Sequence, residues 1–326
     1  MVDSWERDLK LSKTACYPTG WLTCSAVALA VCDLPAARHL ASLAGTGSHF
    51  YCSACNCYHK TTYGRVDFEH WELRDKDRLR EFAEQWRDAA MTSKRGRLFK
   101  DHGVHYSELW RLPYWDPSRQ LVIDPMHCIL EGLVQHHTHN LLSLTTKEHR
   151  FVSPDVLIRV QDVIQEMTVS TWFGSVPSNF GSTSAGTIKA DEWRSLITVY
   201  IPIALISLWG ADTSHPSDEV GTLLRTILDH TMELVCAVYL VCARTATTDR
   251  AHAYRSHIAR YVANLTKIHP TFALRPNHHA TFHIYDYLLL FGPAHSWWCF
   301  HFERLIGILQ RLPVNHKSGE SLWSVS

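Results

Sequence analysis

The stretch from residue 25 to residue 47 constrains the fold most strongly. A strand-length apolar run at 25–32 ends at Asp33, and an Ala-rich segment that begins with Pro35 follows and ends at two glycines. This pattern predicts a strand and then a helix, with the carboxylate of Asp33 at the carboxyl end of the strand. Open α/β sheets bind ligands at that edge, and an ionised carboxylate suits a divalent metal. A plain helix cap is the alternative role for Asp33.

Two cysteines follow this stretch. Cys52 and Cys55 have the two-residue spacing that lets both thiolates reach one tetrahedral zinc ion. The charged start of the sequence, MVDSWERDLK, lacks the apolar segment of a secretion signal, so we expect a reducing compartment and metal ligation or simple burial of the cysteines instead of disulfides. One such pair is half of a site, and two buried cysteines in a tight turn are the alternative.

Composition limits the class of protein. The chain has 326 residues, of which 46% are hydrophobic and 20% charged, which is typical of a globular protein. Lys+Arg and Asp+Glu both number 32, so the chain lacks the basic balance of a domain that holds nucleic acid by phosphate contacts alone. The most apolar run, 193–209, contains Arg194 and Pro202 and is short for a membrane span. We expect a buried, Pro-kinked helix there and no membrane partner.

Apolar periodicity predicts several helices. Residues 75–91 have one apolar face on a charged segment, and residues 126–144 have a broader apolar face. Residues 189–209 and 220–263 are also expected to be helical. The segment 174–186, GSVPSNFGSTSAG, is rich in Gly and Ser and predicts a linker.

Four ordered blocks carry a further signal. They are CDLPAAR with FYCSAC (32–55), LVIDPMHCILEGLVQHH (121–137), KADEWRSLITVYIPIALISLW (189–209) and RPNHHATFHIYDYLLLFGPAHSWWCFHFERLIGIL (275–309). Together these blocks resemble the interior of CACTA-type (En/Spm-like) DNA transposases over most of the chain.

The resemblance implies an α/β fold, in which a ribonuclease H-like core is interrupted by a mostly helical, zinc-bearing insertion and followed by a helical carboxyl-terminal part. We therefore expect a partial core at 1–51 and the insertion at 52–186. The helical part, which carries the third acidic residue, is expected at 187–326.

The resemblance also implies catalytic residues. Asp33 matches the second acidic residue of the family, and Glu192 resembles the third, with Asp191 as the competing assignment. These carboxylates would hold Mg²⁺ or Mn²⁺ for attack on phosphodiesters. The family's first acidic residue belongs to an Asp-Gly strand, and no Asp-Gly occurs between Met1 and Asp33, so we expect an inactive fragment. Acids that only complement a helix dipole are the alternative.

The same resemblance completes the cysteine pair. Asp124-Pro125-Met126-His127 has the Asp-x-x-His form of the family, which implies a structural Zn²⁺ held by Cys52, Cys55 and His127. The fourth ligand stays open among Asp124, Cys57, His136, His137 and His139. A capping Asp followed by a core His is the alternative. His279 and His283 lie four apart, as in helical metal sites, but the glutamate of a His-Glu-x-x-His motif is absent, and we expect neighbouring groups to satisfy them.

Together, these expectations predict that the chain is a transposon-derived DNA transposase fragment. The resemblance implies DNA, in the form of transposon ends, as the partner and the nucleus as the location, and a homo-oligomer is compatible with it. The alternative is a catalytically dead, zinc-containing binding or interaction protein derived from a transposase. A third interpretation is an unrelated zinc protein in which Asp33 and Glu192 are structural.

Overall fold

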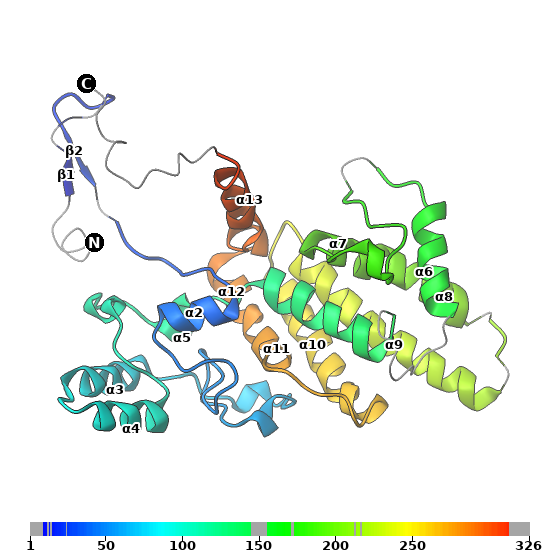
Figure 1. Cartoon of the computed structure of the whole chain (residues 1–326), viewed down its shortest axis with the longest axis horizontal. Coiled ribbons are helices and arrows are strands. Elements are labelled where there is room, and N and C mark those ends of the chain that lie inside the picture. The colour runs from blue at the N-terminus through cyan, green and yellow to red at the C-terminus, as the bar shows by residue number, and fades with distance from the viewer. Residues whose placement is uncertain are drawn as a thin grey trace.

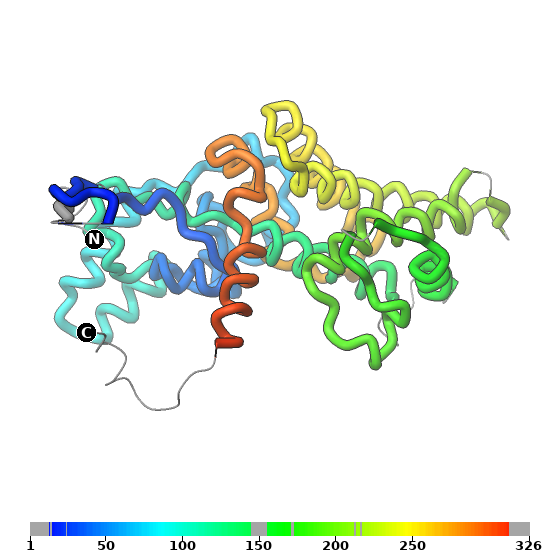
Figure 2. Tube along the Cα trace, turned by 90° about the horizontal axis from the view of Figure 1, so that it is seen from above, coloured from blue at the N-terminus to red at the C-terminus, as the bar shows by residue number. Residues whose placement is uncertain are grey.

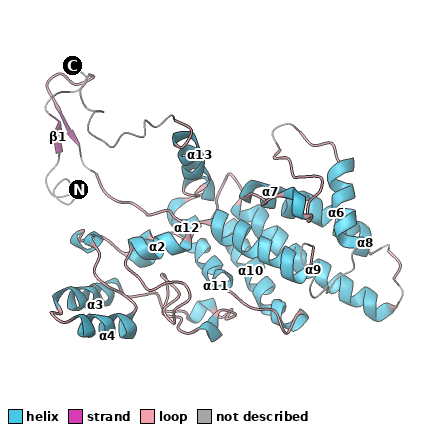
Figure 3. Cartoon of the chain, in the orientation of Figure 1, coloured by secondary structure: helices cyan, strands magenta, loops and turns pink. Residues whose placement is uncertain are grey.

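The structure is a computed structural model that describes residues 9–11, 13, 15–23, 25–144, 155–170, 173–211, 213–215 and 217–312. It is an elongated, mostly helical molecule (Figure 1, Figure 3). Helices α3 and α4 lie at one end, and α6, α8 and the start of α9 lie at the other. The outer parts of the first and last predicted domains, 1–8 and 313–326, lie outside the described residues.

The regular elements follow one another as short and long helices. The two strands are β1 (Leu9–Leu11) and β2 (Trp21–Thr23). The α-helices are α2 (Leu34–Leu40), α3 (Lys76–Asp88), α4 (Thr92–His102), α5 (Pro117–Gln120), α6 (Asp155–Glu166), α7 (Ala190–Ser195), α8 (Ile201–Trp209), α9 (Asp218–Val241), α10 (Thr248–Ile268), α11 (Pro276–Ala280), α12 (Ile284–Phe291) and α13 (Phe300–Leu309). The π-helices are η4 (Met126–Val134), η5 (His137–Leu141) and η7 (Leu196–Tyr200). The short 3₁₀ turns are η1 (Lys60–Thr62), η2 (Phe68–His70), η3 (Glu108–Arg111), η6 (Thr183–Ala185), η8 (Thr281–His283) and η9 (Ala294–Ser296).

The predicted strand at 25–32 is extended but belongs to no sheet. It forms one parallel bridge, in which Ala30 N donates to Gln120 O at 2.7 Å and Val122 N donates to Ala30 O at 3.2 Å. Elsewhere in the described ranges β1 and β2 pair antiparallel, and two isolated antiparallel bridges join Leu43 to Val104 and Cys55 to Leu73. The ribonuclease H-like α/β core is therefore not seen in the described part of the chain, because this segment has one strand-like neighbour and a sheet needs a row of them.

The main core is built by helices from both halves of the chain. Its buried residues run from Val122 to Cys299, and α9 packs along α10 in both views (Figure 1, Figure 2). The boundary predicted at residue 186 lies within this core, because Trp193 and Phe180 both contribute to it. Within the described ranges, every helix is too short or too polar to cross a membrane.

Two smaller cores lie beside the main one. The first joins α2 and α3 to the segment 104–121 and contains the fully buried rings of Trp110 and Trp115. The second surrounds the turn that contains Cys52 and Cys55, which we call the cysteine turn. It contains Tyr51 and Tyr63, and Trp71 packs against both this core and the main one. Burial of aromatic rings of this size is a large part of what stabilises such small cores.

Most predicted helices are present, with shifted bounds. The 75–91 pattern forms α3, capped by Asp75, and the 126–144 pattern forms η4 and η5. The 189–209 pattern forms α7, η7 and α8 in succession, with Pro202 in the first turn of α8. The 220–263 pattern is two helices, α9 and α10, since the chain turns back between them.

The π-helix η4 contacts α11 through Asn277. The Asn277 amide lies against Gly132, where an added Cβ would come within 2.4 Å of Asn277 Nδ2. Asn277 Nδ2 also donates to the carbonyl of Cys128 at 3.3 Å. The contact fixes α11, and with it the histidines of the candidate site.

Candidate metal centre and neighbouring acidic group

Four buried side chains meet in one cluster. They are Cys52, Cys55, His279 and His283. The Cys52 and Cys55 sulfurs are 3.5 Å apart, and Cys55 Sγ lies 3.2 Å from His279 Nε2. The Cys52 Sγ to His283 Nε2 distance is 3.4 Å, and the two Nε2 atoms are 3.3 Å apart. Each residue thus points its ligand atom at the other three.

These separations fit a tetrahedral metal. Zinc binds sulfur at about 2.3 Å and imidazole nitrogen at about 2.0–2.1 Å, so the edges of its tetrahedron are about 3.3–3.8 Å. The four ligand-atom separations match or fall slightly short of that range. A donor set of two thiolates and two imidazoles also binds zinc in preference to magnesium or calcium. The cluster can therefore hold a structural metal such as zinc.

The cysteine turn is held by backbone bonds. Cys55 N donates to Cys52 Sγ at 3.4 Å, which turns the second thiol back beside the first. An antiparallel bridge joins Cys55 to Leu73, and Arg74 N donates to Ala54 O at 2.9 Å. The two-residue spacing thus lies in a loop clamped against residues 72–74.

The histidines come from consecutive helical turns. His279 belongs to α11 and His283 ends η8, four residues later, so both rings lie on one face. The Trp71 ring stacks on His279 with centroids 4.3 Å apart, and Tyr51 approaches it edge-on. His283 Nδ1 lies 3.5 Å from Asp286 Oδ2, the carboxylate contact that orients many metal-bound histidines.

The protonation states of Cys52 and His283 depend on each other. Burial opposes ionisation of Cys52, but the hydrogen bond from Cys55 and the nearby His283 hold the pKa of the Cys52 thiol well below its usual value. Burial also opposes the charge on His283, yet Cys52 and Asp286 raise the pKa of that imidazole to about 10. Both shifts favour a Cys52 thiolate beside a His283 imidazolium, and binding of a metal would release protons.

A second group of ligand-type residues surrounds Asp124. Asp124 Oδ2 accepts from His127 N at 3.0 Å and lies 2.7 Å from His127 Nδ1, while Asp124 Oδ1 accepts from Cys299 N at 2.9 Å. The Asp124 side chain is 1% exposed. Asp124, His127 and Cys299 therefore form a compact, hydrogen-bonded group at the start of η4.

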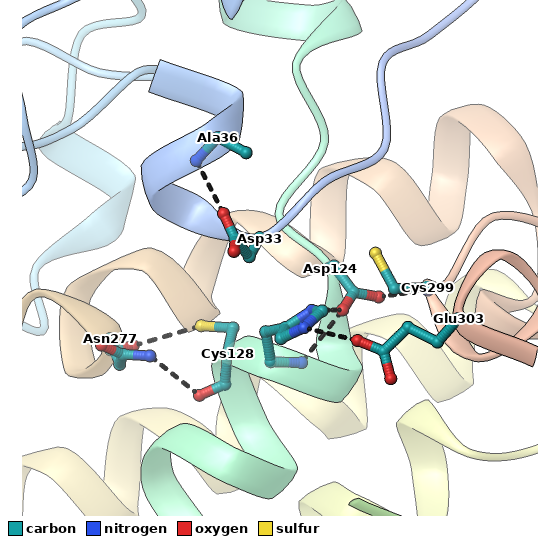
Figure 4. A network of polar contacts seen from close by, with 8 residues as sticks. Asp33, Ala36, Asp124, Cys128, Asn277, Cys299 and Glu303 are labelled. Carbon is teal, nitrogen blue, oxygen red and sulfur yellow. Dashed lines mark hydrogen bonds and ion pairs between the residues drawn. The ribbon is translucent and has the colours of Figure 1, made fainter. Parts of the chain in front are cut away.

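One more carboxylate contacts this group, and another belongs to a neighbouring segment. His127 Nε2 is 3.1 Å from Glu303 Oε1, which projects from α13. Asp33 follows the extended segment that bridges to Leu121, and its Oδ1 accepts from Ala36 N at 2.6 Å as the cap of α2. Figure 4 shows Asp33, Asp124 and Glu303 arriving from three separate segments. Burial, with the charges of Asp33 and Asp124, raises the pKa of the intervening Cys32 thiol. We call Asp33, Asp124, His127 and Glu303 the acidic group.

The structure redistributes the predicted site residues. Cys52 and Cys55 do share a cluster, but its other members are His279 and His283, whereas His127 and Asp124 lie together in the acidic group. The reason is tertiary: η4 presents His127 toward α13, and α11 presents its histidines toward the cysteine turn. The four-residue spacing of the histidines was the only sequence signal for them.

The other candidate ligands lie elsewhere. Cys57 is buried close to the cluster but is not one of its four members. His137 is bonded within the main core to Tyr261 and Thr231, and His136 packs on Phe272. His139 packs against Trp193.

The predicted convergence of Asp33 and Glu192 is not observed. Glu192 Oε2 accepts from Lys189 N at 2.7 Å and caps α7, which lies apart from α2 in Figure 1. A carboxylate in the first turn of a helix is drawn to its free amides, which is the helix-end role weighed for this position. Asp191, the competing assignment, lies in the same turn. Glu303 is the acid that contacts His127, the hydrogen-bond partner of Asp124.

Neither a protein-family model nor a curated protein sequence matches this chain.

Proposed function

We propose that this chain is a zinc-stabilised, nuclear fragment of a CACTA-type DNA transposase, with the acidic group in the place of the catalytic centre. The observation that carries the proposal is that Asp124 and Glu303 both contact His127, with Asp33 in a neighbouring segment, in a chain that also has a buried Cys₂His₂ cluster. Three of the four sequence blocks that resemble the family supply all of these residues.

The cluster and the acidic group are supported by the same segments. The stretch that follows Asp33 contains Cys52 and Cys55, and the stretch that precedes Glu303 contains His279 and His283. A zinc ion held by all four residues would join these stretches and limit the movement of Asp33 relative to Glu303. In two-metal phosphodiester chemistry the carboxylates must converge on ions about 4 Å apart, so such a restraint has a clear use.

Divalent-ion binding tests the acidic group directly. We expect the zinc-loaded chain to bind Mn²⁺, measured by electron paramagnetic resonance, and Glu303→Gln or Asp33→Asn to weaken that binding by about 10-fold or more. Glu192→Gln is the matched control, because it removes an equal charge from α7, and it should leave Mn²⁺ binding unchanged. Mn²⁺ binding that ignores Asp33 and Glu303, or that depends on Glu192, would overturn the assignment.

A second candidate function is a transposase-derived binding or interaction protein without catalysis. The observation that favours it is the engagement of the carboxylates: both Asp124 oxygens accept bonds from the chain, and one Asp33 oxygen caps α2. Carboxylates held in this way have few free lone pairs for two ions. The equal numbers of basic and acidic residues also give little general attraction for DNA.

Nicking of supercoiled DNA in Mn²⁺ separates the two candidates. The binding-protein alternative predicts no nicking above that of the Asp33→Asn variant. Nicking by the wild-type chain that is lost in both Asp33→Asn and Glu303→Gln would establish the enzyme.

A further inference from the structure

A cavity of about 410 Å³ lies on the side of the cysteine turn that faces α3 and α4. Its wall combines cations and aromatic rings: Arg74, Arg78, Phe50, Phe82 and His102. None of these residues belongs to the metal cluster or to the acidic group. The cavity is therefore separate from the metal cluster and from the acidic group.

Arg74 is the unusual member of this wall. The residue is 7% exposed, and its Nε and Nη1 atoms are buried without a hydrogen-bond partner. No carboxylate in the described part of the chain pairs with its guanidinium. A buried, unpaired charge costs several kcal/mol on general grounds, so a guanidinium in this position calls for an anion.

The metal cluster does not supply that anion. Cys52 and Cys55 are the nearby groups whose negative charge, when they are ionised, would favour the charged form of Arg74. With zinc bound, however, the two thiolate charges are balanced by the ion, and the imidazoles are neutral. Arg38, also buried beside Cys52, adds a second cation with one unpaired nitrogen. The region around the cavity therefore has an excess of positive charge.

The rest of the wall suits a ligand with a flat ring. Arg78 lies in the first turn of α3, with its guanidinium carbon 5.9 Å from the Phe82 ring centroid. Phe82 stacks on His102 at 3.7 Å, and Phe50 lies 5.7 Å from the Arg74 guanidinium carbon. Asp75 also lines the cavity, but its Oδ1 accepts from the amides of Asp77 and Arg78 as the cap of α3.

We propose that this cavity binds the phosphate group of a nucleotide, with Arg74 and Arg78 on the phosphate and the aromatic wall against the base. A guanidinium presents a planar fork of donors that matches a phosphate, and two of them balance a dianion. Aromatic rings next to such a fork are the surface on which nucleobases stack. The same chemistry is offered by a free mononucleotide and by a nucleotide of single-stranded DNA.

Ligand-induced thermal stabilisation tests the site on the zinc-loaded chain. The probes are inorganic phosphate, thymidine monophosphate and a short oligothymidylate, because a ligand that binds only the folded state raises its melting temperature. We expect the mononucleotide to bind more tightly than phosphate. A further gain with the oligonucleotide would assign the site to a DNA strand, and equal binding would assign it to the free nucleotide.

Two variants and one control make the test specific. Arg74→Met and Arg78→Met should each weaken mononucleotide binding by about 10-fold or more, since each removes a charge-assisted contact. Arg80→Met removes the same charge from α3 but outside the cavity, where Arg80 pairs with Glu84 at 3.2 Å, and it should bind like the wild type.

The stability of the variants provides a second readout. Because Arg74 is buried without a partner, Arg74→Met should leave the ligand-free melting temperature unchanged or raise it. A marked fall would indicate a structural role and overturn the proposal. Failure of all three probes to stabilise the wild-type chain would also overturn it, as would equal losses in Arg78→Met and Arg80→Met, since Arg78 is exposed and its replacement should not disturb folding.

Discussion

The metal cluster and the acidic group use similar residue types in different ways. In the cluster, four buried ligand atoms point at one centre and have few other partners. In the acidic group, Asp124 is buried but already bonded to the chain, while Glu303 is 54% exposed on α13. Proximity of ligand-type residues therefore does not make a metal site by itself. Free, converging lone pairs do, and the cluster has them where Asp124 does not.

The largest expected effect is on the cluster. Structural zinc contributes on the order of 10 kcal/mol to small metal-bound folds, comparable to the stability of a whole domain. We therefore expect Cys52→Ser, or a zinc chelator, to lower the melting temperature by at least about 10 °C, as measured by circular dichroism. Cys57→Ser is the matched control, because Cys57 is buried nearby but lies outside the four, and it should melt close to the wild type. An unchanged melting curve in chelator would contradict a structural metal.

The next effect belongs to Asp124. Asp124→Ala leaves the buried amides of His127 and Cys299 without their acceptor, and we expect a loss of about 3 kcal/mol in the free energy of unfolding. Asp33→Ala removes only a helix cap and should cost about 1 kcal/mol. Urea denaturation of both variants measures the difference. Equal losses would mean that Asp124 is not the structural acid that its bonds indicate.

A third effect concerns acid stability. His230 is buried with both ring nitrogens unpaired, and burial lowers its pKa to about 4. Because the unfolded chain binds this proton below about pH 6.5 and the folded chain does not, the free energy of unfolding should fall as pH drops from about 6.5 toward about 4. His230→Leu should remove about 2 kcal/mol of that loss, whereas the exposed His39→Leu should not. Parallel urea titrations at pH 7 and 5 measure both, and identical acid sensitivity in the two variants would refute the role of His230.

The smallest effect is at His127. Burial opposes its charge, but Asp124 and Glu303 raise the pKa of this imidazole. A raised folded-state pKa stabilises the fold below about pH 6.5, and this contribution is lost as pH rises through the folded value. Asp124→Asn should lower the His127 pKa more than Glu303→Gln does, since Glu303 is half exposed and its ion pair is screened. Nuclear magnetic resonance titration of the His127 ring in the two variants measures which substitution lowers the pKa more. A larger fall in Glu303→Gln would mean that Glu303, on α13, is the stronger partner of His127.

Sequence patterns predicted the local parts of this molecule better than its long-range parts. The amphipathic α3, the cysteine pair and the cap at Asp33, which was the alternative to its catalytic role, all depend on residues a few positions apart, and the structure has them. The histidine partners of Cys52 and Cys55 in the cluster lie 231 and 224 residues away along the chain, and no sequence-spacing rule reaches so far. The four-residue spacing of His279 and His283 was visible, but it could not show which other ligands they meet.

The wrong predicted roles of His127 as a zinc ligand and Glu192 as a partner of Asp33 have the same origin. Both residues stand in the first turn of a helical segment, where a short pattern cannot tell a cap or a core contact from a ligand. The predicted strand at 25–32 was extended as expected, but a sheet depends on neighbours that only the tertiary structure supplies. Glu303 belongs to the largely apolar block 275–309, and the structure gives His127 as the partner of its charge.

Zinc content and ligand identity test the central claim most directly. We predict about one zinc per purified chain by mass spectrometry, with X-ray absorption showing two sulfur and two nitrogen ligands. His279→Gln and His283→Gln should lose the zinc, and His127→Gln should retain it. A chain that keeps its zinc without His279 and His283, or loses it with His127, would contradict the assignment of the cluster as the metal centre.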